Sequence, residues 1–170
     1  MKLLIRYLRC AFVPVVLLGL LLMIGCGSKV IQYPEDHARY LRIDQAVESL
    51  RQAYVKKEVS GIKALLVSNG PVGRVVTEAE TDFKSFQEIS MEFRIERIII
   101  EGDDIDVYVH WHGQWKTQAD DPGFRQRGHS RLQWMGTTDI LLNGIQGDMP
   151  FGAMGRQALT APPAPSSAAK

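Results

Sequence analysis

The stretch Ile105–Trp115, IDVYVHWHGQW, decides the fold, because apolar and polar side chains alternate along it. Successive side chains of a strand point to opposite faces, so this alternation predicts a strand with one buried face. After the polar loop TQADDPG, residues 125–134 (RQRGHSRLQW) predict another strand that returns beside it. A slip of one residue would mix apolar and charged side chains on both faces. The hydrophobic effect therefore selects one register, whose buried face carries Val107, Val109, Trp111, Gly128, Ser130, Leu132 and Trp134.

The same register gathers imidazole and basic side chains on the polar face of this predicted hairpin. Beside Gln114, they form a candidate surface for a protein partner or an anion: His110, His112, Arg127, His129 and Arg131. Three imidazoles could ligate zinc or copper. The adjacent guanidinium groups would repel a cation, so we assign no metal site. A solvent-exposed face and a homodimer contact are the other interpretations of this surface.

Helices are predicted ahead of the hairpin. Residues 36–57 contain no Gly or Pro, and their large apolar side chains recur at helical spacing, which predicts a long amphipathic helix. A short helix over residues 60–68 would be capped by Ser60 and stopped by Asn69-Gly70-Pro71. Residues 72–87 are ambiguous, with one helical turn in TDFKSFQ as the alternative to a loop.

Two more strands complete the folded region. Alternation with a period of two marks residues 89–100, and DILLNGI (139–145) follows the hairpin as a last strand. Helices followed by a run of antiparallel strands are typical of an α+β fold. In such a fold the helices cover one face of the sheet and leave the other exposed or paired.

This order of elements resembles the nuclear transport factor 2-like superfamily, which includes ketosteroid isomerase and SnoaL-like proteins. The resemblance covers residues 43–152 and depends on three local features: Ala53-Tyr54, Arg127-Gly128 and Gly147-Asp148. It implies a curved antiparallel sheet wrapped around a long N-terminal helix, a cystatin-like cone that often dimerises through its open sheet face. None of the three features is a chemical motif, and a shared fold does not transfer function.

The interior of such a cone is the place to look for a ligand. Four aromatic side chains could line a pocket there, although aromatics at strand spacing more often belong to a core: Tyr54, Trp111, Trp115 and Trp134. By resemblance to ketosteroid isomerase, catalysis would need a carboxylate base and an acidic donor. The predicted inward positions are apolar, and no carboxylate accompanies Tyr54. We therefore expect no enzyme and no cofactor, with a small-ligand binder or isomerase-like enzyme as the alternative.

The N-terminus predicts export and lipid attachment. Residues 1–25 combine a short basic head with an apolar run, which is typical of a signal peptide. The following MIGC resembles the bacterial lipobox, with Met23 where Leu is usual, and implies that the Cys26 thiol carries a diacylglycerol. Acyl chains of this kind give near-permanent anchoring. An uncleaved membrane span over residues 10–28 and ordinary secretion remain as alternatives.

These observations predict the domain boundaries and the cellular location. Residues 26–34 are predicted to be a tether, 35–153 the folded domain, and 154–170 a disordered Ala/Pro-rich tail. By resemblance to Gram-negative lipoproteins, Gly27 in place of Asp favours the outer membrane. The formal net charge of +1 gives no argument for nucleic acid. The leading hypothesis is a lipid-anchored cell-envelope protein, facing the periplasm, that binds an envelope protein partner or itself.

Overall fold

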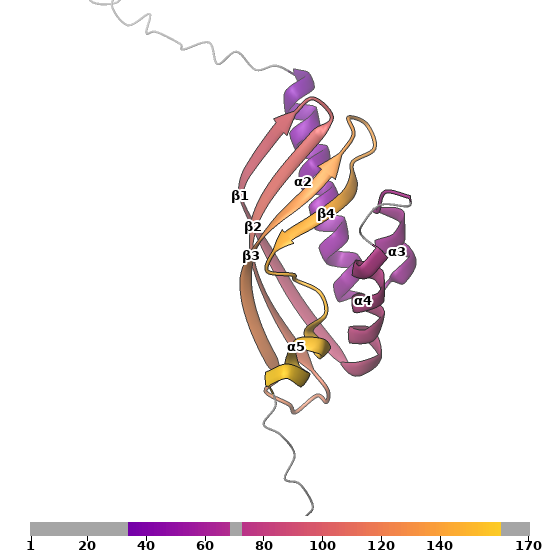
Figure 1. Cartoon of the computed structure of the whole chain (residues 1–170), viewed down its shortest axis with the longest axis vertical. Helices are drawn as coiled ribbons and strands as arrows, with labels where there is room; N and C mark the ends of the chain where they lie inside the picture. The colour runs from indigo at the N-terminus through magenta and orange to yellow at the C-terminus, as the bar shows by residue number, and fades with distance from the viewer. Residues whose placement is uncertain (1–33, 69–72, 161–170) are drawn as a thin grey trace, which may run out of the picture. The chain divides into compact units, whose positions relative to one another are not determined.

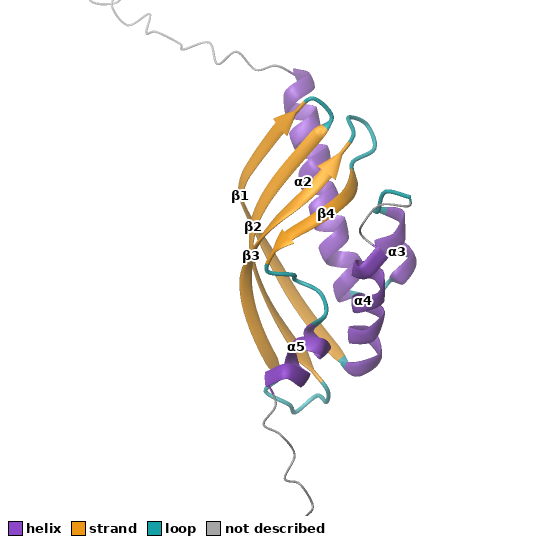
Figure 2. Cartoon of the chain, viewed as in Figure 1, coloured by secondary structure: helices purple, strands orange, loops and turns teal. Residues whose placement is uncertain are grey.

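The computed structural model describes residues 34–68 and 73–160, and its elements follow the predicted order (Figures 1 and 2). The predicted signal peptide, Cys26 and the tether up to residue 33 lie outside the described residues, as does the tail beyond residue 160. In chain order the elements are α2 Pro34–Val55, α3 Val59–Ala64, α4 Gly73–Ser85, β1 Glu88–Glu101, β2 Asp104–Lys116, β3 Phe124–Met135, β4 Leu141–Gly147 and α5 Ala153–Thr160.

The strands form one four-stranded sheet in the order β1-β2-β3-β4, and each strand is antiparallel to its neighbours. The sheet is curved, and the helices lie on its concave side (Figure 1). The predicted α+β fold with a curved antiparallel sheet is therefore confirmed. The predicted register is confirmed as well, because Trp111 pairs with Gly128 and Val109 pairs with Ser130.

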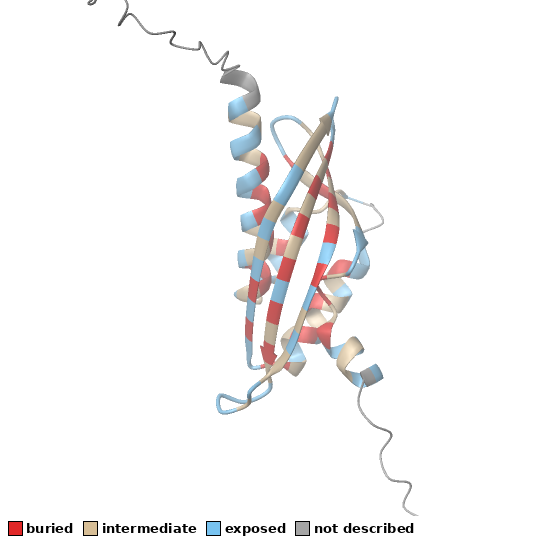
Figure 3. Cartoon of the chain, turned by 90° about the vertical axis from the view of Figure 1, so that its left-hand side faces the viewer, coloured by how far each residue is buried: buried red, intermediate tan, exposed pale blue. Residues whose placement is uncertain are grey.

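The hydrophobic core lies between the sheet and the helices. Buried and exposed residues alternate along the strands as bands (Figure 3). α2 contributes Ile43, Val47 and Leu50, which are 0–3% exposed and share one face of that helix. Because each element buries one side only, its apolar residues recur about every four positions in the helix and every two in the strands. This recurrence is what allows the sequence to predict the fold.

Both ends of α2 are tied to the sheet by side-chain hydrogen bonds. Near its start, Arg39 Nη2 donates to the carbonyl oxygens of Gly102 at 2.7 Å and Gly136 at 3.1 Å, in two turns between strands. Just after its end, Lys57 Nζ donates to the carbonyl oxygens of Phe86 and Gln87 beside the start of β1. The helix therefore lies along the length of the strands.

Two of the three features behind the family resemblance meet in space. A Cβ atom added to Gly128 would lie 2.5 Å from Asp148 Cβ and 2.9 Å from Trp111 Cζ2. The carbonyl oxygen of Asp148 accepts hydrogen bonds from Trp111 Nε1 at 2.9 Å and from Ser130 Oγ. Glycine at position 128 therefore lets the chain after β4 approach β3 closely, which gives this local pattern a physical basis.

Several predicted boundaries are wrong. α3 starts at Val59 after an N-cap at Glu58, so Ser60 lies inside the helix and does not cap it. α3 also ends at Ala64, because the following chain leaves it to form a short parallel bridge with β4 between Leu66 and Leu142. The ambiguous region, residues 72–87, contains the whole of α4.

The predicted disordered tail starts too early. Residues 153–160 form α5, and Arg156 within it donates to the Phe151 carbonyl oxygen and to Gln126 Oε1, each at 2.5 Å. Composition alone suggested disorder, but Phe151 and Ala153 are fully buried and supply the apolar contact that orders this segment. Over residues 34–68 and 73–160, no helix has both the length and the apolar character needed to cross a bilayer. The apolar run over residues 10–28 is outside these ranges.

Candidate functional site

The predicted polar surface exists as one face of the sheet. We call the side of the sheet turned away from the helices the outer face. In the β2–β3 ladder, His110 pairs with His129 and His112 pairs with Arg127. Arg131 follows two positions along β3 and points to the same side. The structure thus brings together all five residues predicted for a partner or anion surface.

A hollow of about 580 Å³ lies at the β1-start end of this face, and we call it the outer groove. Its lining comes from β1, β2 and β3 and is polar: Ser90, Glu92, His112, Gly113, Gln114, Arg125, Gln126 and Arg127. His112 Nε2 lies 3.4 Å from Glu92 Oε2, so the Glu92 carboxylate faces this imidazole within the groove. Arg125 and Arg127 are exposed and have no hydrogen-bond or ion-pair partner among the described residues.

A neighbouring hollow of about 360 Å³ lies over the middle of the outer face. Here the arginines have partners: Arg131 Nη1 is 3.5 Å from Asp106 Oδ2, and the Arg97 guanidinium lies 4.2 Å from the centroid of the Tyr108 ring. Glu96 also lines this hollow. The positive charge of the outer face is therefore least compensated in the outer groove.

Histidines and a carboxylate cluster beside this second hollow. The rings of His110 and His129 stack with centroids 4.6 Å apart, and His129 Nε2 lies 3.5 Å from Glu96 Oε1. One potential ligand atom from each of these residues lies within 4.8 Å of the others. His112, also predicted to be near the other histidines, is not part of the cluster.

The four aromatic residues predicted to line a ligand pocket are buried. Their exposed fractions are 0–2%, and they lie on the helix-facing side of the sheet: Tyr54, Trp111, Trp115 and Trp134. Trp115 Nε1 donates to the Tyr54 hydroxyl at 2.8 Å, and the Tyr54 ring meets Phe151 edge-on with centroids 4.7 Å apart. These four side chains belong to the hydrophobic core of the domain.

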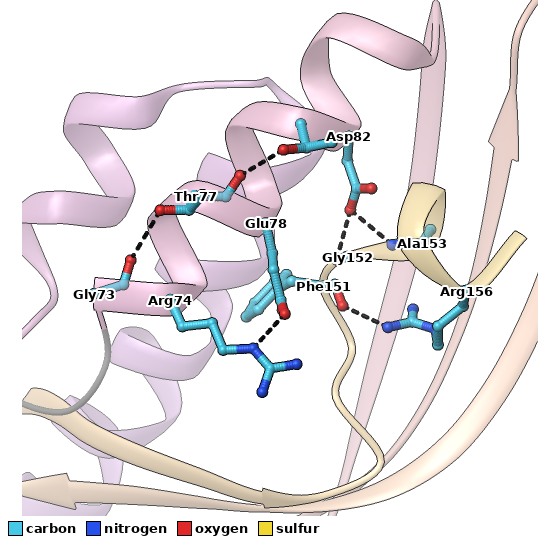
Figure 4. Close-up of polar contacts among 10 residues, drawn as sticks. Gly73, Arg74, Thr77, Glu78, Asp82, Phe151, Gly152, Ala153 and Arg156 are labelled. Atoms are coloured by element: carbon cyan, nitrogen blue, oxygen red, sulfur yellow. Dashed lines mark hydrogen bonds and ion pairs between the residues drawn. The ribbon is translucent and has the colours of Figure 1, made fainter. Parts of the chain in front are cut away.

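A carboxylate does accompany Tyr54, contrary to the sequence prediction. Asp82 of α4 is fully buried, and its Oδ2 accepts a hydrogen bond from the Tyr54 hydroxyl at 2.6 Å. The same oxygen accepts from the backbone N–H groups of Gly152 and Ala153 (Figure 4). Asp82 Oδ1 accepts from the backbone N–H of Met154. Asp82 therefore caps the N-terminus of α5 from another helix and connects it to the Tyr54–Trp115 pair.

Burial shifts the pKa values of two side chains in and beside this network, Tyr54 and Arg156. It raises the pKa of the Tyr54 hydroxyl far above the ordinary value for tyrosine, and the negative charge of Asp82 adds to the rise. Burial also lowers the pKa of the Arg156 guanidinium, while Asp82 and Tyr54 act in the opposite direction. Tyr54 is consequently a neutral hydrogen-bond donor throughout the physiological pH range.

Sequence reasoning missed Asp82 because α4 was not recognised. The signal was present, since Val75, Ala79, Asp82 and Phe86 recur at helical spacing and are all buried. A carboxylate on the buried stripe of a helix needs hydrogen-bond donors around it. Glu96 was missed for a different reason, because it is the extra residue of a β-bulge between Ile95 and Arg97.

No protein-family model matches the sequence, and no curated protein is significantly similar to it. Solved structures share its fold at low identity. A conserved protein from Planctomyces limnophilus is 15% identical, with a TM-score of 0.57 over 66% of this chain and 99% of that one. A nuclear transport factor 2-like superfamily protein from Salmonella enterica serovar Typhimurium is 13% identical, with a TM-score of 0.56 over 68% and 93%.

A third similar structure is a proposed dehydratase of the nuclear transport factor 2-like family from Streptomyces avermitilis. It is 11% identical, with a TM-score of 0.51 over 65% of this chain and 96% of that one. At such identities the likeness concerns the fold alone. The chain thus has the nuclear transport factor 2-like fold that its sequence resembles.

Replacing Asp82 with asparagine tests its role as the cap of α5. Asparagine offers one acceptor oxygen and an NH₂ group in place of two acceptor oxygens, so at least one of the four donors loses its partner. We expect D82N to lower the free energy of unfolding by about 1–3 kcal/mol in chemical denaturation. The matched control is E80Q, a partly exposed carboxylate on the same helix, with a change within about 0.5 kcal/mol. Equal stability of D82N and the wild type would contradict the assignment.

Proposed function

We propose that this protein is a lipid-anchored cell-envelope protein whose domain is a non-catalytic binding or assembly module. In this proposal the outer groove accepts an acidic segment of a protein partner. The main support for this proposal is a pair of exposed arginines, Arg125 and Arg127. They line a hollow of about 580 Å³, and their guanidinium groups have no hydrogen-bond or ion-pair partner among the described residues. Carboxylates of a partner would give these guanidinium groups charge-assisted, bidentate hydrogen bonds.

The interior supports a binding role over a catalytic one. Tyr54 and Asp82 are 0% exposed, and their side chains hydrogen-bond to each other, to Trp115 and to backbone N–H groups at the start of α5. A substrate could reach them only if some of the groups packed around them moved away, among them Phe151, whose ring lies against that of Tyr54. The outer face, in contrast, is open and rich in groups that recognise charge.

Charge also favours an unlike partner over a second copy of this chain. A two-fold symmetric contact through the outer groove would bring Arg125 and Arg127 of one protomer close to the same residues of the other. Like charges placed together in an interface oppose association. An acidic partner removes that repulsion, so we propose a heterologous contact and treat self-association as an outcome to be tested.

The proposed anchor depends on Cys26, which lies outside the described residues. We expect C26S to abolish processing and lipid attachment, because serine lacks the thiol that the acyl group requires. The measurement is mass spectrometry of the mature N-terminus, together with fractionation of cell membranes after salt washing. A C26S protein that still matures and stays with the membrane would contradict the lipobox interpretation. The parallel control is C10S, in the proposed signal peptide, which should mature normally.

The groove is tested by charge reversal in intact cells. A photo-crosslinking residue replaces the exposed Ser90 of the groove, and adducts are analysed in otherwise wild-type protein and in R125E/R127E. We expect the adduct to fall at least about tenfold in R125E/R127E, because unlike charges become like charges at the contact. K56E/K84E makes the same change in charge at exposed lysines outside the groove and should leave the adduct unchanged.

The same experiment separates the two kinds of partner. An adduct of twice the mass of the protein, still formed by R125E/R127E, would replace the proposal with a homodimer. An adduct that is equally reduced in R125E/R127E and K56E/K84E would show a response to overall charge and would argue against a specific groove.

A dehydratase- or isomerase-like enzyme is the second candidate. It is favoured by one specific observation, the direct hydrogen bond between the neutral Tyr54 hydroxyl and Asp82 in the interior. The similar structure from Streptomyces avermitilis is named as a proposed dehydratase, although its likeness to this chain extends to the fold only. This candidate requires some of the groups packed around Tyr54 and Asp82 to move before a substrate can bind.

Ligand binding inside the cone would raise thermal stability by mass action. If the second candidate is correct, some member of a panel of β-hydroxy carbonyl compounds should raise the melting temperature of the wild type. The rise should be lost in Y54F, which keeps the ring and removes the hydroxyl. Because Tyr54 and Asp82 are both 0% exposed, we expect no rise with any member, and a Y54F-sensitive rise would overturn that expectation.

A further inference from the structure

We propose that Glu96, His110 and His129 form a binding site for a divalent transition-metal ion on the outer face. Each residue comes from a different strand, namely β1, β2 and β3, and one potential ligand atom of each lies within 4.8 Å of the others. Two imidazoles and one carboxylate are ligands that zinc, nickel and copper accept. This site is independent of the outer groove and of the proposed partner.

A β-bulge places the carboxylate in the site. Ile95 pairs with Val109 and Arg97 pairs with Tyr108, so Glu96 has no partner of its own on β2. Bulges change the direction of a side chain and are frequent beside functional sites. Here the bulge lets Glu96 reach across β2, and its Oε1 lies 3.5 Å from His129 Nε2 on β3. A regular ladder would give Glu96 a partner on β2 instead.

The two imidazoles are held by the ladder itself. His110 and His129 are directly opposite in the β2–β3 register, with rings 13° from parallel and centroids 4.6 Å apart. A tetrahedral ion about 2.0–2.1 Å from each ligand keeps those ligands about 3.3 Å apart. Glu96 and His129 already have nearly that separation. His110 is within 4.8 Å of the other two ligand atoms, so the site requires its imidazole to turn toward the ion.

Nearby arginines oppose a cation, but part of their charge is already matched. Arg131 Nη1 lies 3.5 Å from Asp106 Oδ2, and Arg131 Nη2 donates to Gln146 Oε1 at 2.7 Å. Arg97 stacks on Tyr108. Arg94, the register partner of His110 on β1, has no ion-pair partner among the described residues. We therefore expect micromolar affinity, well below that of a closed structural zinc site.

The surroundings leave a coordination position open. Glu96 and His129 line the hollow of about 360 Å³, and their side chains are 45% and 67% exposed. Three protein ligands plus one open position is the arrangement of zinc sites that exchange water or bind a further ligand. A side chain of another protein could complete the coordination from this hollow.

The sheet supplies a matched control. His112 and Glu92 lie on the same outer face, also on β2 and β1, with Nε2 and Oε2 3.4 Å apart. The register partner of His112 on β3 is Arg127, so this pair has a guanidinium where His110 has a second imidazole. It reproduces the exposed histidine–carboxylate contact without the third ligand.

Isothermal titration calorimetry of the full chain in detergent micelles, with Zn²⁺ and separately with Ni²⁺, tests the site. We expect one ion to bind per chain. E96Q, H110N and H129N should each weaken binding at least about tenfold, whereas H112N and E92Q should change it less than about twofold. Because all five side chains are at least partly exposed, the variants should fold, and circular dichroism verifies this.

A second readout uses stability. At one Zn²⁺ concentration near the wild-type Kd, the ion should raise the melting temperature of the wild type and of H112N, and should raise that of E96Q much less, because stabilisation follows occupancy of the site. Absence of binding by the wild type up to millimolar Zn²⁺ and Ni²⁺ would overturn the proposal. Equal weakening in the His112–Glu92 variants would overturn it as well, because binding would then be a general property of exposed histidines.

Discussion

Burial of one face of the sheet under the helices is the constraint from which the other features follow. With a period of two along β2 and β3, placing Trp111 and Leu132 inside leaves His110 and Arg131 outside. A shift by one residue would reverse both faces of β2 or β3 at a cost of many buried apolar groups. The positions of the outer groove and of the histidine cluster are therefore determined by the core.

The interior contains a buried polar network, centred on Asp82, among apolar side chains. Asp82 accepts four hydrogen bonds, three of them from the backbone at the start of α5. A buried carboxylate without these donors would be strongly destabilising. Since the donors come from a segment 70 residues later in the chain, this cap holds α5 in place. The neighbouring Phe151 packs edge-on against the Tyr54 ring.

Sequence reasoning succeeded where one physical signal dominated. The strands and α2 were predictable because their apolar positions repeat with periods of two and near four, and the β2–β3 register followed from burial. α4 was ambiguous because Asp82 interrupts its apolar stripe, although the interruption is itself the polar part of the site. α5 was missed because its order comes from Asp82 and the buried Phe151, which are distant contacts that composition does not report.

In the site, too, the features set by the local sequence were predictable, and those set by distant contacts were not. All five outer-face residues were predicted, since facing follows from alternation. The contribution of Glu96 depends on a bulge that adds one residue to β1 without an evident mark in the sequence. Within the described part of the chain, Arg125 and Arg127 lack ion-pair partners because the nearby carboxylates of the outer face contact other side chains. Such pairings are known only once the positions of all strands are known.

The length of α2 has a consequence for how the domain would be presented to its surroundings. At about 1.5 Å per residue, its 22 residues extend about 33 Å, and Arg39 fixes its first turns beside the β1–β2 turn. Ser90 and Arg125, in the outer groove, lie at the opposite end of the strands. The start of α2 and the outer groove therefore lie at opposite ends of the sheet, so a contact made at the groove is separated by the length of the strands from the point where the chain enters the domain.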